Sequence, residues 1–484
     1  MKQRLADYVA DFLVSHGIKH CFSVVGGGAM HLNDALGHKD GLKVIYTHHE
    51  QAAAIAAESY ARLDNNIAAV CVTTGPGGVN ALTGVLCGWL DSIPMFIISG
   101  QVRYDTTARY AKKLRGINLR ALGDQEYDII NSVKAMTKYA VMIENPERIK
   151  YELERAYHLA TTGRPGPVWL DIPVNFQGAY IETSNLESYD PSEDDKLLPP
   201  AVSDDVIKDV ISLIKESKRP VLYAGYGIRL SGGYEIFRQL IEKLNIPVVT
   251  YWNAIDLIEN SHRLYTGRGG NMGDRPGNFA VQNSDLVLAI GTRLSIRQVG
   301  YNWDTWARAA KIIMVDIDKN EMNKHTIHAD FKIWADAKDF MNKLNAAIDH
   351  KIFNDSSWLE TCSNWKKNYP VVLTRHYEQK KLANIYAFID YLSSKLHDKN
   401  LTVVSNGACC VAGSQAYRIK KDARFINNSA TASMGYGLPA SIGACVNYIG
   451  GGGGINWRKD SSNLSRRRRQ HNDELAGTPD SNNK

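Results

Sequence analysis

The stretch 68-AAVCVTTGPGGVNALTGV-85 places a short apolar, β-rich segment directly before a turn that is rich in glycine. Residues 68–74 predict a buried strand, because a short apolar run bounded by a turn signal fits a strand that is covered on both faces. The GPGG segment at 75–78 predicts the turn, and a helix is expected to follow it. A buried strand, a turn and a helix together form the repeating unit of a parallel α/β sheet.

The same unit recurs outward in both directions along the chain. Short apolar runs separated by helical stretches extend over 1–182, which predicts a doubly wound parallel-sheet domain. Residues 183–202 are polar and acidic and predict a linker. A second α/β pattern occupies 203–346, and a third, incomplete one occupies 370–446. We therefore predict an α/β fold of three doubly wound parallel-sheet domains, the third of them incomplete. The predicted strands are 20–25, 42–47, 68–74, 95–100, 168–173, 220–225, 247–252, 285–291, 311–318, 401–406 and 424–429.

The composition excludes several classes of protein. The 484 residues are 44% hydrophobic and 22% charged, which is typical of a globular chain with large apolar cores. A net charge of +6 is too weak, in a chain of this length, to indicate a nucleic-acid partner. Seven cysteines without a CxxC pair predict reduced thiols in a cytoplasmic protein. No run reaches 18 apolar residues, so we expect no membrane partner.

Three segments hold residues that could carry chemistry. Glu50 begins an alanine-rich helix, where a carboxylate either interacts with the helix dipole or tunes a bound cofactor through a hydrogen bond. The turn at 75–78 lets the backbone approach a ligand, but it also fits an ordinary turn, since neither a Walker sequence nor a GxGxxG fingerprint is present. Met434 lies among glycines in 430–444 and fits either a core residue or a contact with a flat group.

Together, in this order and at these distances, the segments resemble the thiamine-diphosphate enzymes of the acetolactate synthase and pyruvate decarboxylase superfamily. The resemblance covers residues 1–446. It implies decarboxylation of a 2-keto acid such as pyruvate, with transfer of the acyl group to an acceptor. The segments that carry it are HHEQAAA (48–54), TTGPGGVN (73–80), ISGQV (98–102), GDQEYD (123–128), RPGPVWLDIPVN (164–175), NSDLVLAIGTRLSIRQ (283–298) and TASMGYGLPASIGA (431–444).

The resemblance implies roles for particular residues. The domain at 1–182 would bind the pyrimidine ring of thiamine diphosphate, and the partial domain at 370–446 would bind the diphosphate. Glu50 would hydrogen-bond the pyrimidine ring and favour its imino tautomer, while Met434 would act as an apolar wedge. The implied catalytic residues are Glu50, Gln101 and Gln125. The implied cofactor-binding residues are Gly75, Pro76, Asn80, Gly407, Ala408, Ala432, Ser433 and Met434. The implied substrate wall is formed by Gly26, Gly27, Gly28 and Asp124.

The resemblance also bears on the central domain and on assembly. The region 203–346 is similar to the domain that holds FAD in acetolactate synthases, but many relatives keep this domain without FAD, so flavin binding stays open. The family builds each active site between two subunits, which implies a homodimer or a homotetramer. A nicotinamide-dependent oxidoreductase is disfavoured, because the dinucleotide fingerprint is missing. The candidates for an FAD site are Gly225, Gly227, Gly267 and Arg293.

Asp124 departs from the family pattern. Acetolactate synthases usually carry an aromatic residue just before the Gln-Glu pair of this segment, whereas Asp124 stands before Gln125 here. An acid suits a more polar acceptor than a second pyruvate. The alternative that follows is the same chemistry on a nucleotide-sugar acceptor in polysaccharide synthesis.

The tail at 447–484 has no helical or strand period and is expected to be aberrant and disordered. The family's third domain continues with a GDGS segment that helps to bind Mg2+, whereas this chain has Arg466–Arg469 near that position and no metal ligands. Synonymous codons can be chosen for residues 465–471 so that the same DNA, read one base later, encodes Leu-Glu-Gly-Asp-Gly-Ser. We therefore expect a frameshift between Val446 and Trp457. The alternatives are an intended basic extension and an inactive truncated product or non-catalytic subunit.

Overall fold

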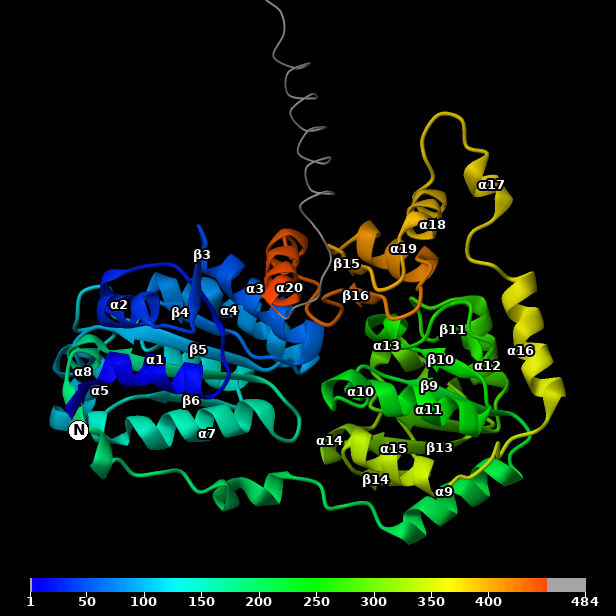
Figure 1. Cartoon of the computed structure of the whole chain (residues 1–484), viewed down its shortest axis with the longest axis horizontal. Helices are drawn as coiled ribbons and strands as arrows, with labels where there is room; N and C mark the ends of the chain where they lie inside the picture. The colour runs from blue at the N-terminus through cyan, green and yellow to red at the C-terminus, as the bar shows by residue number, and fades with distance from the viewer. Residues whose placement is uncertain (1, 451–484) are drawn as a thin grey trace, which may run out of the picture.

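The computed structural model describes residues 2–450, which form three α/β units (Figure 1). The first and central units each contain a six-stranded sheet whose strands all run parallel. Within the described residues, the third unit contributes two parallel strands. The predicted α/β class with parallel sheets is confirmed.

The first sheet has the strand order β3-β2-β4-β5-β7-β6. Strands β4, β5 and β7 are buried along their whole length, because helices cover both faces of the sheet and leave apolar cores on either side. The strands are β2 (His20–Ser23), β3 (Lys43–Tyr46), β4 (Ala69–Val72), β5 (Met95–Gln101), β6 (Tyr139–Met142) and β7 (Pro167–Pro173). The helices are α1 (Leu5–Ser15), α2 (Met30–His38), α3 (Glu50–Asp64), α4 (Pro76–Asp91), α5 (Ala108–Arg115), α6 (Ile129–Val133), α7 (Ile149–Thr161) and α8 (Val174–Gln177). A separate antiparallel pair joins β1 (Lys2–Arg4) to β8 (Tyr180–Glu182).

The central sheet has the order β11-β10-β9-β12-β13-β14 and encloses one large apolar core. Its strands are β9 (Pro220–Ala224), β10 (Val248–Thr250), β11 (Tyr265–Arg268), β12 (Leu286–Ile290), β13 (Lys311–Asp316) and β14 (Phe331–Trp334). Its helices are α9 (Asp204–Glu216), α10 (Gly227–Leu230), α11 (Tyr234–Leu244), α12 (Arg275–Asn283), α13 (Ile296–Val299), α14 (Lys319–Met322) and α15 (Ala337–Ala346).

The third unit lies between the other two in Figure 1 and is connected to the central unit through α16 and α17. Its two strands are adjacent and parallel, so the loops that follow them emerge at the same edge of the sheet. The elements are α16 (Ser356–Asn368), α17 (Thr374–Tyr377), α18 (Ile385–Lys395), β15 (Leu401–Val403), α19 (Ala408–Ala416), β16 (Arg424–Ile426) and α20 (Gly437–Gly450).

Helix α3 is packed closely between α4 and α20, and its alanines make this possible. A side-chain carbon added to Gly84 of α4 would lie 2.4 Å from the Cβ atom of Ala54. A side-chain carbon added to Gly443 of α20 would lie only 1.8 Å from the carbonyl oxygen of Ala56. The small side chains on all three helices therefore bring their backbones together, and α20 docks the third unit onto the first.

The sequence analysis missed the short pair β1 and β8 and, in the two large sheets, β6, β11 and β14, each of which is an edge strand. An edge strand keeps one side in contact with solvent or loops, so its sequence is less uniformly apolar than that of a central strand. Strand β14, with the sequence FKIW, is exposed at its first two residues. Strand β11, with the sequence YTGR, contains a glycine and an arginine.

The segment predicted as a linker, 183–202, lies on α7 as short helical turns. The Tyr151 hydroxyl donates a 2.6 Å hydrogen bond to Glu193, and Arg155 forms an ion pair with Asp194. At the other end of the chain, the predicted tail begins at 447, inside the last turn of α20, and residues 451–484 lie outside the described residues. No helix in the described part of the chain is long and apolar enough to cross a membrane.

Candidate functional site

Glu50 is the first residue of α3 and lies beside the turn that precedes α4. The Asn80 side-chain amide of α4 donates a 3.0 Å hydrogen bond to Oε2 of Glu50. A side-chain carbon on Gly77 would lie 3.5 Å from Oε1 of Glu50 and 2.7 Å from a methyl carbon of Thr73. Gly77 therefore allows the close approach of Thr73, while Oε1 of Glu50 accepts no hydrogen bond within the described residues. The imidazole of His49 caps the helix by accepting a hydrogen bond from the backbone amide of Gln51.

The turn at 75–78 faces the segment that holds Asp124 and Gln125. Gly75 has a φ of +59°, and a side-chain carbon there would lie 2.5 Å from the carbonyl oxygen of Gln125. Only glycine tolerates both this positive φ and this close contact, which explains why position 75 of the turn is a glycine. The carboxylate of Glu126 accepts hydrogen bonds from the backbone amides of Ala108, Leu122 and Gly123. Glu126 thereby fixes the exposed Asp124 and Gln125, a role that its sequence position did not reveal.

Gln101, at the end of β5, is buried and its side-chain amide is fully engaged within the protein. Its Nε2 donates to Asp171 at 3.0 Å and to the Tyr127 carbonyl at 2.8 Å. Its Oε1 accepts from the hydroxyl of Thr74 at 2.7 Å and from the amide of Val102 at 3.0 Å. An amide can make only these four bonds. The geometry therefore favours a positioning role for Gln101 over direct contact with a substrate.

Asp171 is fully buried beneath this network. The Ser99 hydroxyl donates a 2.6 Å hydrogen bond to it, while burial raises the pKa of its carboxyl group to about 7. The hydrogen bonds from Ser99 and Gln101 oppose this rise in pKa, so burial is the larger effect.

Gly26, Gly27 and Gly28 lie against the same turn. A side-chain carbon on Gly26 would lie 2.5 Å from Cβ of Thr73, and the amide of Gly28 donates a 3.1 Å hydrogen bond to the Thr73 hydroxyl. Gly27 faces open space. The loops after β2, β3, β4 and β5 thus meet at one edge of the first sheet, which is where open α/β sheets bind ligands.

A second group of candidates lies in the third unit. Gly407 has a φ of +82°, faces open space and precedes the first residue of α19, Ala408. The Asn406 side chain donates a 2.5 Å hydrogen bond to the carbonyl of Ser433, which ties the loop after β15 to the loop after β16. Ala432 has a φ of +55° and Met434 is 88% exposed, so this loop presents a carbonyl and an apolar side chain outward.

The two groups are held on different units. Among the hydrogen bonds of residues 2–450, Glu50 is joined only to Asn80, and none joins it to the loop at 432–434. The units are connected further along the helices, where the Thr431 hydroxyl donates a 3.4 Å hydrogen bond to the Leu86 carbonyl. The chain therefore presents two half-sites, one on each unit.

Comparisons with known proteins identify the family of the first and central units. Residues 3–118 match the model of the thiamine pyrophosphate enzyme N-terminal TPP binding domain, and residues 207–344 match that of the thiamine pyrophosphate enzyme central domain. A probable acetolactate synthase large subunit of Methanocaldococcus jannaschii is 34% identical, over 91% of this chain and 73% of its own. The large subunit from Buchnera aphidicola of Schizaphis graminum is 31% identical, over 90% of this chain and 74% of its own. The chain belongs to the thiamine pyrophosphate enzyme family. The acetolactate synthase isozyme 1 large subunit of Escherichia coli is 29% identical, over 91% and 74% of the two chains.

In this thiamine pyrophosphate enzyme, a cavity of about 860 Å3 lies where the three units meet. Two of the four proposed FAD residues, Gly227 and Arg293, line it. Gly225 lies behind the lining, where a side-chain carbon would be 2.2 Å from the Gly291 carbonyl oxygen, so it permits two loops to approach. Gly267 packs against Asp274 and is not part of the lining.

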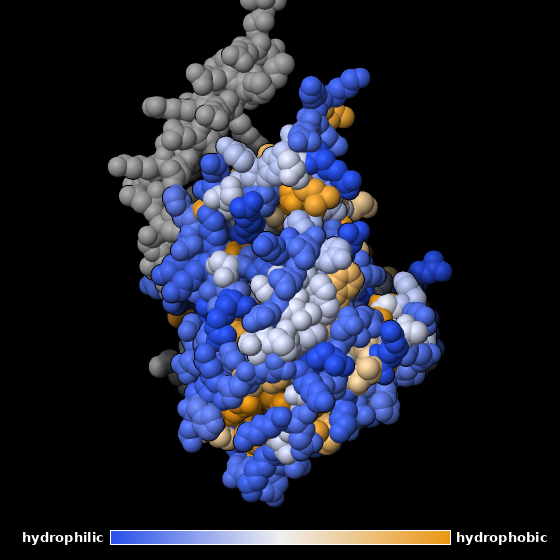
Figure 2. Space-filling view, turned by 90° about the vertical axis from the view of Figure 1, so that its right-hand side faces the viewer, coloured by the Kyte–Doolittle hydropathy of each residue, from blue (hydrophilic) through white to orange (hydrophobic). Residues whose placement is uncertain are grey.

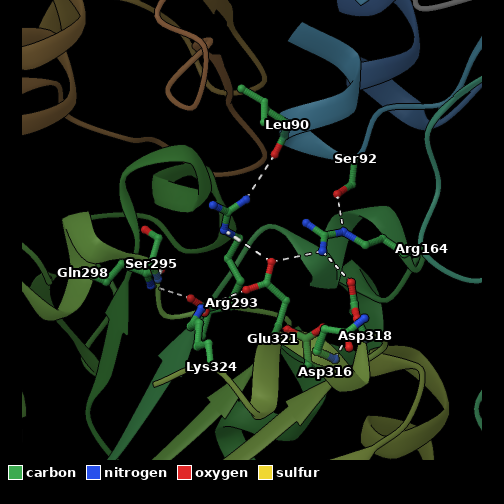
Figure 3. Close-up of polar contacts among 12 residues, drawn as sticks. Leu90, Ser92, Arg164, Arg293, Ser295, Gln298, Asp316, Asp318, Glu321 and Lys324 are labelled. Atoms are coloured by element: carbon green, nitrogen blue, oxygen red, sulfur yellow. Dashed lines mark hydrogen bonds and ion pairs between the residues drawn. The ribbon is translucent and has the colours of Figure 1, made fainter. Parts of the chain in front are cut away.

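Charged side chains from two units converge on one wall of this cavity (Figure 3). Arg164 forms ion pairs with Asp318 at 2.9 Å and with Glu321 at 3.1 Å, and its Nε donates to the Ser92 hydroxyl. Lys324 forms a 2.8 Å ion pair with Glu321 and also donates to the carbonyl of Arg293. The sequence analysis assigned no role to Arg164, Glu321 or Lys324. Arg164 begins the quoted segment 164–175, but its partners on the central unit come from a distant part of the chain.

Proposed function

We propose that this chain catalyses thiamine-diphosphate-dependent decarboxylation of a pyruvate-like 2-keto acid, with transfer of the acyl group to an acceptor, as the acetolactate synthase resemblance implies. The observation that carries the proposal is the half-buried Glu50 carboxylate, whose Oε2 is held by Asn80 while its Oε1 accepts no hydrogen bond within the described residues. A carboxylate held in this way can accept or donate a hydrogen bond at a ring nitrogen.

The residues of the two half-sites fit thiamine diphosphate. Oε1 of Glu50 has no partner within the described residues and can meet a ring nitrogen, and the exposed Met434 provides an apolar surface for the ring to rest on. Gly407 leaves the first amides of α19 accessible, and the N-terminal end of a helix favours phosphate oxygens. When bound, the cofactor supplies an electron sink for loss of carbon dioxide. Glu50 would hold the proton at the ring nitrogen, and Asn80 would orient Glu50.

The proposal includes Mg2+ only because the family resemblance implies it. Among residues 2–450, no group of three or more His, Cys, Asp and Glu side chains could hold a metal ion. The segment for which we predicted a lost GDGS sequence lies outside these residues. Resequencing of the DNA for residues 440–484 tests the expected frameshift, which an unshifted frame in independent clones would contradict.

Two half-sites on different units support the proposal that the active unit is at least a homodimer. Exposed apolar side chains accompany both halves, with Val25 and Met30 near the first and Met434 and Leu438 near the second. Isolated apolar side chains at a surface are common, but their grouping at two complementary half-sites fits contact with a second subunit. Light scattering coupled to gel filtration would test this, and a purely monomeric protein at working concentration would contradict it.

A nucleotide cofactor, FAD among them, is the second part of the proposal. The central cavity has the volume of an ordinary cofactor pocket. Arg293 and Arg297 line it. Arg293 lies 3.7 Å from Glu321 in an ion pair, whereas Arg297 forms no ion pair within the described residues, so Arg297 is the better suited to phosphate oxygens. The absorbance spectrum of the purified protein, before and after incubation with FAD, is the test; a flavin band retained after gel filtration is the expected result.

The identity of the molecule that accepts the acyl group is the most specific part of the proposal. Asp124 is exposed beside Gln125 and the glycine turn, so an acceptor at the first half-site would meet a carboxylate. We propose an acetolactate synthase-like reaction on a keto-acid acceptor, with a more polar acceptor, a nucleotide sugar, as the alternative that Asp124 suits. Mass spectrometry of products formed from pyruvate with each acceptor distinguishes these cases, and replacement of Asp124 by Phe is expected to favour the keto acid.

A further inference from the structure

A second cavity, of about 290 Å3, lies away from both half-sites, between the central unit and the helices that begin the third. Strand β11 and the start of α12 form one side of it, the end of α16 a second, and the segment after α19 a third. The face of the molecule that carries α16 is mostly hydrophilic, with a few separate hydrophobic areas (Figure 2). The cavity has the size of the smallest ordinary ligand pockets.

Arg268 lines this cavity and is 3% exposed. Its two terminal nitrogens donate to the carbonyls of Gln415 and Tyr417, the latter at 2.7 Å, but its Nε has no acceptor within the described residues. No carboxylate of that part of the chain forms an ion pair with it. Asp274 lies near, yet its oxygens accept from the backbone amides of Arg268 and Gly277. A buried donor without an acceptor is costly, unless a ligand or water supplies one.

Lys366 is a second cation on the cavity wall without an ion-pair partner in the described residues. Its ammonium group donates to the carbonyls of Asn260 at 2.5 Å and Tyr265 at 3.2 Å. Burial lowers the pKa of Lys366, and the charge of nearby Asp274 opposes this shift without cancelling it. Arg418, by contrast, is neutralised by an ion pair with Asp390. Asp274 and Asp390 also line the cavity, so three cationic side chains face two carboxyl groups and the lining keeps an excess of one cation.

The remaining wall is largely apolar. Pro276, Tyr369, Val371 and Val372 line it between the two cations and the solvent. A hydrated inorganic ion would make no apolar contact with these side chains. A carboxylate attached to a short aliphatic or aromatic body would satisfy both kinds of wall.

We propose that this cavity binds a small organic carboxylate, with the carboxylate between Arg268 and Lys366 and the apolar body against Val371 and Val372. The site is separate from the thiamine diphosphate half-sites and does not depend on the proposed function. Its ligand would contact β11, α16 and the segment after α19 at once, and so would stabilise the junction of the central and third units.

Calorimetric titration of the full chain at low ionic strength tests the proposal, with isovalerate and benzoate as probes. Isovaleramide serves as the uncharged control and inorganic phosphate as the control for a bare anion. We expect at least one carboxylate to bind with a Kd of about 1 mM or below. We expect neither isovaleramide nor phosphate to bind comparably. Absence of carboxylate binding, or tighter binding of phosphate, would overturn the assignment.

A matched pair of variants locates the binding. Val372→Glu adds a negative charge to the wall, whereas Val372→Gln adds nearly the same volume without charge. We expect the first to weaken binding of the carboxylate at least about tenfold relative to the second, through like-charge repulsion. Lys366→Met should weaken binding as well, with the exposed neighbour Lys367→Met as its control. Circular dichroism verifies that the variants fold. Carboxylate binding that is equal in both members of each pair would overturn the proposal.

Discussion

The Tyr436 hydroxyl donates a 2.8 Å hydrogen bond to Oε2 of Glu58, and both residues are completely buried. This bond connects the third unit to α3, the helix that carries Glu50 at its first residue. Arg62, one turn further along α3, holds the other oxygen of Glu58 and also Asp91 of α4. Its carbonyl accepts hydrogen bonds from Tyr226 of the central unit and Arg424 of the third. The second half of α3 is thus the junction of all three units.

Tyr436→Phe should destabilise the protein by about 1–3 kcal/mol, because it leaves a buried carboxylate without one of its donors. Burial already raises the pKa of Glu58, so this carboxylate depends on its partners. The urea midpoint of unfolding, followed by far-ultraviolet circular dichroism, measures the change. Tyr127→Phe removes an exposed hydroxyl contact with Ser132 and is the control. Equal midpoints for the two variants would contradict the assigned role.

Arg62→Met should be more damaging. Arg62 is 2% exposed and separates two buried carboxylates, so its loss leaves both without a counter-ion, at a cost of about 3–5 kcal/mol. Arg103→Met breaks an exposed ion pair with Asp105 and should have a far smaller effect. Thermal unfolding of the two variants provides the comparison, and similar melting temperatures would show that the buried cluster is not what holds the units together.

Gly443→Ala tests the close packing of α20 on α3. The added carbon would lie 1.8 Å from the Ala56 carbonyl oxygen, so the two helices must separate. A cost of about 1–3 kcal/mol is expected for such overpacking. The same change at Gly27 meets open space and serves as the control. If Gly443→Ala has the same melting temperature as the wild type, α20 is not packed against α3 in solution.

Stability should fall as the pH rises from about 4 to about 7. The pKa of Asp171 is about 7 in the folded protein, above its ordinary value of 3.8, so the folded state keeps a proton that the unfolded state has lost. Asp316, whose pKa burial raises to about 6, adds to the effect over the lower part of the range. Asp171→Asn should reduce the slope of melting temperature against pH. Parallel slopes for the variant and the wild type would contradict a protonated Asp171.

Much of the fold follows from short buried runs in the sequence. Central strands such as β4 and β12 are apolar throughout, because helices cover both their faces, and were therefore predictable. The edge strands β11 and β14 carry mixed residues and were missed, and β6, which is only four residues long, was missed although it is apolar. Their pairing depends on the neighbouring strand rather than on their own periodicity.

The candidate site, like the fold, was predictable from the sequence only in part. Glu50 and the glycine turn stand next to strand ends, so local sequence was enough to place them at one edge of the sheet. The supports supplied by Glu126, Asn406 and Asp171 come from segments that meet only in the folded chain. No spacing in the sequence indicates those contacts. The same holds for the cations Arg268 and Lys366, because only the folded structure shows that neither has an ion-pair partner within the described residues.

Release of carbon dioxide from pyruvate is the most direct test of the central claim, measured with thiamine diphosphate and Mg2+ on the protein translated from the resequenced gene. We predict release that requires thiamine diphosphate and falls about a hundredfold or more in Glu50→Gln, as expected for loss of a proton-transfer group. Asn80→Ala, which frees the Glu50 carboxylate without removing it, should cause a smaller loss. Release that is absent with thiamine diphosphate, or unchanged in Glu50→Gln, would contradict the account.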